Sequence, residues 1–315
     1  MLSFSLSPVS RSEYDRLTTS LPLPLYMQSA WLESVATPSA IDYYVVYRSD
    51  SPVAVFPIYQ PLKGVWITPP NCQTTGIRFF PETDFFDRRK AIALLADRMA
   101  SVSFARVATD IVEGDLLPFY WKGFSLGVRY NYEMPIPRDA MAIYSSVSAE
   151  DIRQKIKKTE RHPFTVRTGA LSEEGAKILA CHYRTKGIAS HFLSSLLKAG
   201  KEQGFWVELV ADASVVAVSF LCTACRRTYF LASAVDFKAL KSYPFLYIAL
   251  LYYTLLEAAK TDATIFDFEG SMLPQIERTF RHMGARPVPY FTIAKGRRTL
   301  WQRYRLKRYY LHLQP

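Results

Sequence analysis

The sequence lacks a hydrophobic stretch long enough to cross a bilayer. Its longest apolar run extends from Phe245 to Leu256 and is interrupted only by Thr254, whereas a transmembrane helix needs about 20 predominantly apolar residues. The first residues, MLSFSLSPVSRSEYDRL, lack the basic start, apolar core and cleavage site of an export signal. We therefore expect a cytoplasmic protein, and its 315 residues suit two domains of about 150 residues each.

Cysteine is scarce, with Cys72, Cys181, Cys222 and Cys225 scattered along the chain. This spacing is typical of reduced thiols and excludes a dense disulfide framework. Cys222 and Cys225 form a CxxC motif inside the apolar run VVAVSFLCTAC, without a second pair or a histidine cluster to complete a zinc site. We interpret them as core cysteines of a strand and expect no metal.

Acidic residues are absent from the last eighth of the chain, although the formal net charge is +11. Ten basic residues lie there: Arg278, Arg281, Arg286, Lys295, Arg297, Arg298, Arg303, Arg305, Lys307 and Arg308. Such a concentration favours an anionic partner such as nucleic acid, lipid headgroups or a phosphorylated substrate, but a solvated helix face is also common.

The segment 295–315 is predicted to form a basic C-terminal helix. Leu300, Tyr304, Lys307 and Leu311 fall on one stripe that arginines flank. We expect this helix to contact tRNA or an anionic membrane surface, which would place the protein at the inner membrane face, or else to serve solubility alone.

The second half reads as an ordered series of helices and strands. A basic helix begins at Ser148, and the strand FTVRT, two helices, and the strands FWVELVAD, VVAVSFLCT and TYFLASAV follow. A long apolar helix after Pro244, the strand ATIFDFE, a helix ending at Gly284 and the strand VPYFTIA complete it. This order predicts an α/β fold with a mixed sheet covered by helices on both faces.

The first half repeats this order more loosely. Helical YMQSAWLESVA precedes the strands YYVVYRS, VAVFPIY and GVWIT, which lead to the helix DRRKAIALLADRMA and the strand FARVATDIV. The two halves end alike, in DLLPFYWKGFSLGVRYNYEMPI and SMLPQIERTFRHMGARPVPYFTIA. We therefore predict a duplicated domain, with bounds 1–142 and 143–294.

The stretch DFEGS, residues 267–271, places acids at the end of an apolar strand. Because side chains alternate along a strand, Asp267 and Glu269 are predicted to share one face, about 6 to 7 Å apart. The arrangement indicates either a strand tip in solvent or a functional site. The first half has TDIVEGD instead.

The element order, the DFEGS stretch, IRQKIKKTERHPFTV and RTFRHMGARPVPYF together resemble a GNAT acyltransferase domain. The whole chain resembles the Fem-like aminoacyltransferases and their short relatives labelled BioF-type acetyltransferases. The resemblance implies two tandem GNAT-like domains, with the N-terminal one degenerate and the active site in the C-terminal one.

The resemblance also implies an acyl donor, either acyl-CoA or aminoacyl-tRNA. Where GNAT proteins have a glycine-rich loop for the coenzyme A pyrophosphate, this chain reads DFKALKSYP. Fem-like proteins share this degeneracy, which favours aminoacyl-tRNA. Lys238, Lys241 and Ser242 at the start of the following helix, together with Gly270 and Ser271, are the predicted donor-binding residues.

Glu269 is the predicted general base that removes a proton from an acceptor amine. It could equally cap the next helix or pair with Arg278. Asp267 would orient a cationic partner or be structural, and Tyr290 would donate a proton to the leaving group or simply pack.

Arg153, Lys157 and Arg161 lie four residues apart on the basic helix, and with Arg278 they are the predicted contacts to a phosphate-bearing acceptor, unless they form a solvated face. The resulting hypothesis is an N-acyltransferase that acts on an amine, with a cell-envelope precursor as its acceptor. The alternative is a non-catalytic binding module on a GNAT scaffold that recognises RNA or lipid phosphate.

Overall fold

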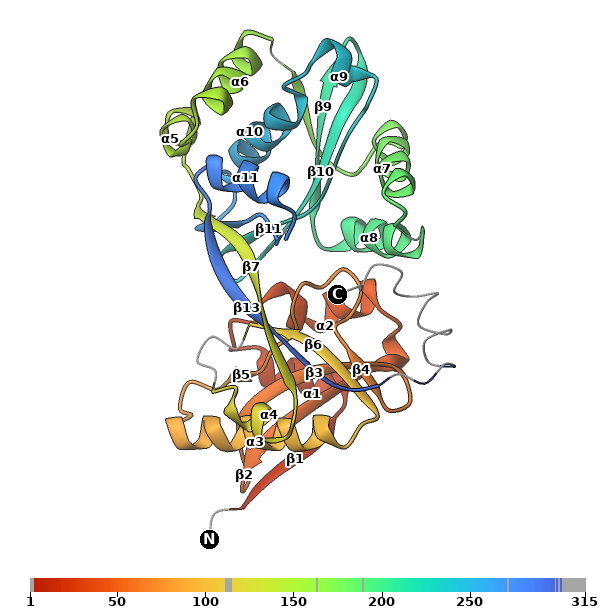
Figure 1. The fold of residues 1–315 in the computed structure, drawn as a ribbon, viewed down its shortest axis with the longest axis vertical. Helices are drawn as coiled ribbons and strands as arrows, with labels where there is room; N and C mark the ends of the chain where they lie inside the picture. The colour runs from red at the N-terminus through yellow and green to blue at the C-terminus, as the bar shows by residue number, and fades with distance from the viewer. Residues whose placement is uncertain are drawn as a thin grey trace. The chain divides into compact units, whose positions relative to one another are not determined.

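A computed structural model describes residues 3–110, 115–162, 164–188, 190–270 and 272–297, together with 299 and 301. The chain divides into two compact units. Unit 1 comprises Met1–Arg129 with Pro289–Pro315, and unit 2 comprises Tyr130–Val288. Each unit is a sheet with helices packed on it (Figure 1).

Unit 1 contains most of the first half of the chain (Figure 1). Its elements are β1 (Phe4–Val9), α1 (Arg11–Thr18), η1 (Leu25–Met27), α2 (Ser29–Val35), η2 (Pro38–Ala40), β2 (Ile41–Arg48), β3 (Ser51–Leu62), β4 (Val65–Ile67), β5 (Arg78–Phe79), α3 (Phe85–Ala100), β6 (Phe104–Thr109) and α4 (Leu117–Trp121). The strand order is β1-β2-β3-β4-β6-β13, with β5 beside β3. The β4–β6 pair is parallel, and the other strand pairs are antiparallel.

Unit 2 contains the second series of elements. They are β7 (Ser125–Pro135), which begins in unit 1, then α5 (Ala140–Ser146), α6 (Glu150–Arg161), β8 (Thr165–Gly169), α7 (Glu173–Thr185), α8 (Ser190–Glu202), β9 (Phe205–Ala211), β10 (Ser214–Ala224), β11 (Arg227–Val235), α9 (Ala239–Ser242), α10 (Leu246–Ala258), β12 (Ile265–Asp267), α11 (Pro274–His282) and β13 (Arg286–Gly296), which ends in unit 1. The strand order is β7-β12-β11-β10-β9-β8, and the β11–β12 pair is the parallel one.

The two units have the same topology, which confirms the predicted fold class and the repeated order of elements. Both series run as four antiparallel strands, one parallel neighbour and one antiparallel last strand. The last strands are exchanged, however: β7 closes the first series in sequence but pairs with β12, and β13 closes the second series but pairs with β6. The compact units therefore differ from the expected bounds 1–142 and 143–294, and the independence of those domains stays a prediction.

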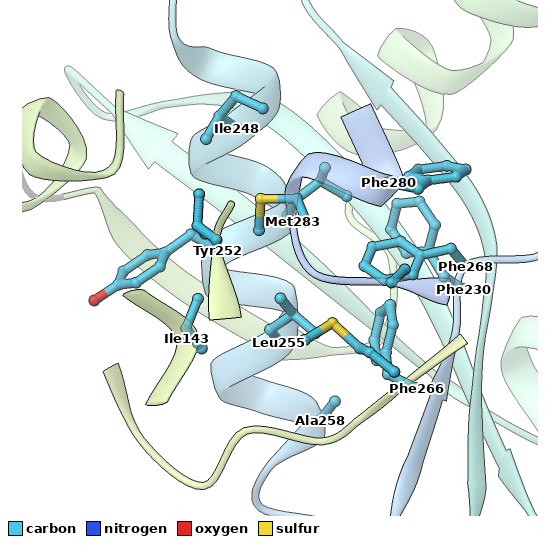
Figure 2. Close-up of a cluster of buried hydrophobic side chains, with 14 of the residues drawn as sticks. Ile143, Phe230, Ile248, Tyr252, Leu255, Ala258, Phe266, Phe268, Phe280 and Met283 are labelled. Carbon is cyan, nitrogen blue, oxygen red and sulfur yellow. The ribbon is translucent and has the colours of Figure 1, made fainter. Parts of the chain in front are cut away.

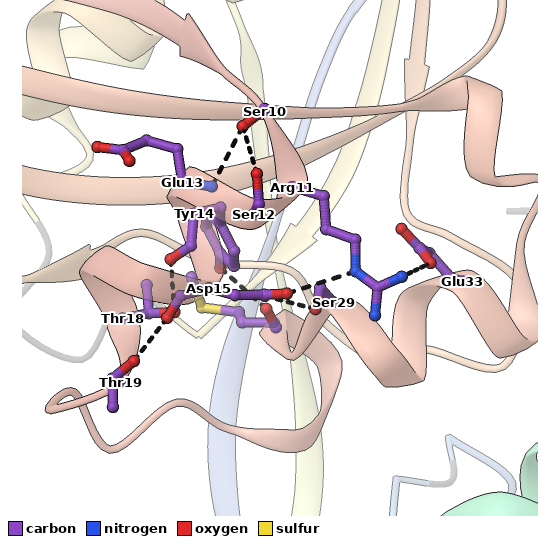
Figure 3. A network of polar contacts seen from close by, with 11 residues as sticks. Ser10, Arg11, Ser12, Glu13, Tyr14, Asp15, Thr18, Thr19, Ser29 and Glu33 are labelled. Atoms are coloured by element: carbon purple, nitrogen blue, oxygen red, sulfur yellow. Dashed lines mark hydrogen bonds and ion pairs between the residues drawn. The ribbon is translucent and has the colours of Figure 1, made fainter.

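A strand and a helix at the N-terminus were not foreseen from the sequence. Helix α1 begins after Ser10, whose hydroxyl accepts a hydrogen bond from the backbone N–H of Glu13. The buried hydroxyl of Tyr14 donates to the carbonyl of Met27 over 2.9 Å, and the hydroxyl of Ser29 donates to Asp15 over 2.6 Å (Figure 3). These contacts tie α1 to the segment η1–α2.

The predicted basic helix begins slightly later than expected, because Ala149 rather than Ser148 is the N-terminal cap of α6. The predicted tail helix 295–315 also begins differently, since Lys295 and Gly296 are the last residues of β13. Residues 298, 300 and 302–315 lie outside the described residues. Among the helices that the structure describes, none combines the length and apolarity that a membrane crossing requires.

The core of unit 2 surrounds α10, whose side chains are almost all apolar. Phe230, Phe266, Phe268 and Phe280 form one aromatic group in this core (Figure 2). The ring centroids of Phe266 and Phe268 lie 4.8 Å apart, and those of Phe268 and Phe280 also lie 4.8 Å apart. Phe266 belongs to β12, Phe268 follows Asp267, and Phe280 belongs to α11. The core therefore fixes the chain on both sides of the DFEGS stretch.

Candidate functional site

The strands β11 and β12 form a fork in the sheet of unit 2. They are hydrogen-bonded through only three residue pairs, of which the last is Tyr229 with Asp267. Beyond this pair β11 continues to Val235, whereas β12 ends. Side chains at the carboxyl end of β12 therefore lie where the sheet opens.

The chain leaves β12 through the irregular segment from Asp267 to Gly270, which we call the acidic turn. Glu269 has a φ of 60°, in the left-handed region that non-glycine residues rarely occupy. A carboxylate oxygen of Asp267 accepts the backbone N–H of Glu269 over 2.9 Å. This hydrogen bond stabilises the turn. The left-handed backbone of Glu269 costs about 1–3 kcal/mol, and such strain is often found at functional sites.

The turn corrects the prediction that Asp267 and Glu269 share one face of a strand. Side-chain alternation requires extended backbone, and the strand ends at Asp267. As a result Asp267 is buried with 2% of its surface exposed, whereas Glu269 is half-buried and Gly270 exposed. Ser271 lies outside the described residues.

Asp267 belongs to a partly buried polar cluster that also contains Arg227, Glu133 and Asn131. The guanidinium of Arg227 lies 3.0 Å from Oδ2 of Asp267 and 2.5 Å from Oε1 of Glu133. The register explains this contact. Asp267 lies between Tyr229 on β11 and Glu133 on β7, and Tyr229 is two residues from Arg227 along β11. Arg227 therefore forms ion pairs with both carboxylates.

Burial raises the pKa of Asp267 to about 7, since removal from water disfavours the charged carboxylate. Arg227 acts in the opposite direction, and the negative charge of Glu133 adds to the increase. Burial also acts to lower the pKa of Arg227, but Asp267 and Glu133 outweigh it and keep the guanidinium charged. Asp267 can therefore gain or lose a proton near neutrality.

Asn131 completes the cluster from β7. Its amide nitrogen donates to Oδ2 of Asp267 over 3.0 Å. Its amide oxygen is buried and has no hydrogen-bond partner among the described residues. Sequence reasoning missed Asn131, Glu133 and Arg227, because no local pattern brings residues so far apart in sequence to one point.

The predicted donor-binding residues Lys238, Lys241 and Ser242 lie together between β11 and α10, and all three are exposed. Ser242 does not begin the long helix, as expected, but ends the short helix α9. The helix α10 begins four residues later, at Leu246. The separation follows from Pro244, since the residue before a proline disfavours helical backbone.

The predicted acceptor-binding residues Arg153 and Lys157 are brought together on α6, above the ring of Tyr144. Arg153 also donates to the carbonyl of Val147 over 2.7 Å. Arg161 ends the same helix, and Arg278 lies on α11, both exposed.

The predicted proton donor Tyr290 is a buried residue of β13, in the part of that strand that belongs to unit 1. Its role is not tested by this geometry and stays a prediction.

The prediction that Cys222 and Cys225 are core cysteines of a strand is right for Cys222 and wrong for Cys225. Cys222 is buried in β10, and burial raises the pKa of its thiol to about 12, while Cys225 is exposed in the turn before β11. Within the described part of the chain, no three His, Cys, Asp or Glu side chains are grouped to hold a metal ion.

Comparison with known proteins establishes the fold but not a family. No model of a protein family and no curated protein matches the sequence. Among solved structures, FemX matches with a TM-score of 0.64 and 13% identity over 91% of this chain and 96% of that chain.

Two further solved structures share this fold. The C-terminal domain of a putative lysylphosphatidylglycerol synthetase from Agrobacterium fabrum matches with a TM-score of 0.53 and 12% identity, over 91% of this chain and 93% of that chain. A tandem GNAT protein from the clavulanic acid biosynthesis pathway matches with a TM-score of 0.52 and 12% identity, over 93% of this chain and 98% of that chain. The chain thus has the tandem GNAT-like fold of Fem-like proteins, as the sequence predicted.

Proposed function

We propose that the chain is an N-acyltransferase, which moves an acyl or aminoacyl group from a thioester or an aminoacyl-tRNA to an amine. The observation that carries this proposal is the acidic turn at the fork of β11 and β12. Ligands of open α/β sheets gather at the carboxyl ends of strands, where such forks open. The shared fold with FemX and a tandem GNAT protein supports the same activity.

In the proposed reaction, the nitrogen of the acceptor amine attacks the carbonyl carbon of the donor. An amide C–N bond forms, and the ester C–O or thioester C–S bond breaks. Glu269 accepts a proton from the attacking nitrogen, because its half-buried carboxylate follows the end of β12. The leaving oxygen or sulfur takes up a proton from water; Tyr290, to which the sequence assigned this role, belongs to unit 1 and keeps it only as a prediction.

Asp267 acts as a positioning residue in this scheme. Its carboxylate accepts the backbone N–H of Glu269 and is itself held by Arg227 and Asn131. The cluster therefore fixes the backbone of the proposed base without taking part in the proton transfer.

The segment between β11 and α10 supports aminoacyl-tRNA as the donor over acyl-CoA. A coenzyme A pyrophosphate needs several free backbone N–H groups in this place. Here the N–H of Lys238 donates to the side chain of Asp236, and those of Leu240, Lys241 and Tyr243 donate to carbonyls of the same segment. The segment fits a pyrophosphate poorly, whereas the exposed Lys238 and Lys241 suit an RNA phosphate.

The proposed acceptor is an amine of a cell-envelope precursor, as the resemblance to Fem-like proteins implies. Arg153, Lys157, Arg161 and Arg278 are proposed to bind its phosphate groups. With such an acceptor, and with the basic tail on tRNA or anionic lipid, the protein would work in the cytoplasm at the inner membrane face.

Thermal unfolding of the full chain with a panel of donors tests this proposal. Aminoacyl-tRNA at 100 times its dissociation constant should raise the free energy of unfolding by about 2.7 kcal/mol. Acetyl-CoA and longer acyl-CoAs at the same concentration should raise it less. Equal stabilisation by uncharged tRNA, aminoacyl-tRNA and anionic vesicles, with no amine acylated in any mixture, would instead show a non-catalytic binding module.

A further inference from the structure

Unit 1 exposes a group of large apolar side chains on α3 and α4, which we call the aromatic patch. It consists of Phe85, Phe86, Leu117, Tyr120 and Trp121, whose exposed fractions are 65%, 74%, 48%, 64% and 61%. The two helices pack on one another, and the rings of Phe85 and Phe86 lie edge to face with centroids 5.7 Å apart. Contiguous apolar surface of this kind marks a site of interaction with another protein or a membrane.

The patch is presented by a rigid support. The opposite face of α3 packs in the core of unit 1 through Ala91, Ile92, Leu95 and Met99. The helix begins after Asp84, whose carboxylate accepts the backbone N–H of Asp87 over 2.8 Å. The exposed rings are thus held outward by the fold.

Basic side chains surround the aromatic patch. Arg89, Lys90 and Lys122 line a hollow together with Phe86 and Trp121, and Lys122 also pairs with Asp97. The guanidinium of Arg89 lies over the ring of Trp121, 5.6 Å from its centroid, and also pairs with Asp115. Aromatic rings flanked by Arg and Lys are the composition of helices that lie in the interface of an anionic membrane.

We propose that the aromatic patch inserts into the surface of an anionic phospholipid bilayer, with the surrounding cations at the headgroups. The exposure of the rings favours this occupant, because a small ligand would need rings that enclose it, whereas each of these four rings is more than half exposed. These cations complement an anionic surface. The proposal does not depend on the proposed reaction.

Sedimentation of the full chain with vesicles tests the proposal. The wild type should bind phosphatidylglycerol–phosphatidylcholine vesicles, and more weakly vesicles of phosphatidylcholine alone. Phe86→Ser and Trp121→Ser should each lower the partition coefficient about tenfold, since each removes a large apolar side chain from the interface. Met141→Ser is the matched control, because it removes an exposed apolar side chain from α5 of unit 2 and should change nothing.

The charge contribution is tested in the same assay. Lys90→Glu should weaken binding to the anionic vesicles several-fold at low salt and hardly at all at high salt. Lys177→Glu, an equal charge change at an exposed position of α7, is its control. Equal losses in the two variants would contradict a local role of the patch.

Tryptophan fluorescence gives a local readout. Trp31, Trp66 and Trp206 are buried, so Trp301→Phe leaves Trp121 as the exposed tryptophan. Its emission should shift to the blue on anionic vesicles and be quenched by brominated lipid. Vesicle binding that persists unchanged in Phe86→Ser and Trp121→Ser would overturn the proposal and assign binding to another surface. A dimer in solution that Trp121→Ser dissociates would overturn it in favour of a second copy.

Discussion

The two units share one arrangement of strands but differ in the side chains at the fork. In unit 2 the parallel ladder begins with Arg227 and ends with Asp267. The same positions of the ladder in unit 1 are occupied by Val65 and Arg106. The parallel ladder therefore carries the ion pair in unit 2 only.

The edge strand shows the same contrast. Glu133 on β7 lies opposite Asp267, whereas Ala294 on β13 lies opposite Arg106. The first acid after β6 is Asp110, which pairs with Arg78 over 2.6 Å near the surface. The comparison shows that apolar periodicity maintains the fold of both units, whereas the proposed chemistry depends on a few polar residues at equivalent positions.

The largest contrast is expected in catalysis. Glu269→Gln should lower the rate of acyl transfer by about 10² to 10⁴, the usual contribution of a general base. Asp110→Asn, the matched change in unit 1, should leave the rate within about twofold of wild type. The rates are measured in single turnover, and thermal unfolding of both variants checks the fold. Equal loss in both variants would end the assignment of chemistry to unit 2.

A second contrast concerns the pH dependence of stability. Because the folded pKa of Asp267 is raised to about 7, the folded state retains this proton above the pKa of the unfolded chain. The contribution of Asp267 is fully present below pH 4 and is lost as the pH rises toward 7, by at most about 1.4 kcal/mol for each pH unit.

The amide of Asp267→Asn does not titrate in this range. The free energy of unfolding of this variant minus that of wild type should therefore rise between pH 4 and pH 7. Urea unfolding at several pH values measures the difference. A constant difference across this range would show that Asp267 is ionised throughout. Asp110→Asn is the control in unit 1, where the ion pair is more exposed.

The arginines should differ in their contribution to stability. Arg227→Met leaves two partly or fully buried carboxylates without their cation and should cost about 3 kcal/mol. Arg78→Met leaves one carboxylate, Asp110, which is 30% exposed and can be hydrated, and should cost less, about 1 kcal/mol. Urea unfolding compares the two variants, and equal costs would show that burial does not distinguish the two ion pairs.

The smallest effects should be alike in both units, since they concern the shared scaffold. Ala213 in the β9–β10 turn and Ser49 in the β2–β3 turn have positive φ values, of 64° and 54°. Replacing either with glycine should raise the free energy of unfolding by about 1 kcal/mol. Destabilisation of either variant would show that its side chain contributes more than the strain it causes.

Most of the fold could be predicted from the sequence, because its elements have strong local patterns. The apolar helix after Pro244 and the three consecutive strands β9, β10 and β11 lie close to their predicted ranges. The exchange of β7 and β13 could not be predicted, since an edge strand with the same pattern can pair with either sheet. Strand β1 and helix α1 were missed because they are short and depend on contacts such as that of Tyr14 with Met27.

The candidate site was only partly predictable. Asp267 and Glu269 were identified because acids are unusual after an apolar strand, but their separation by a left-handed turn has no signal in the sequence. Asn131 lies 136 residues from Asp267 along the chain and meets it only through the exchanged strand β7. The partners of a buried charge therefore have to come from the structure.

The most direct test of the central claim is acyl transfer by the full chain. A labelled aminoacyl-tRNA is mixed with the protein and a lysine-containing peptide, and the label on the peptide amine is measured over time. Our account predicts that wild-type protein acylates the amine and that Glu269→Gln does not. Label that leaves the tRNA no faster with the wild-type chain than without it, and never appears on the amine, would contradict the account.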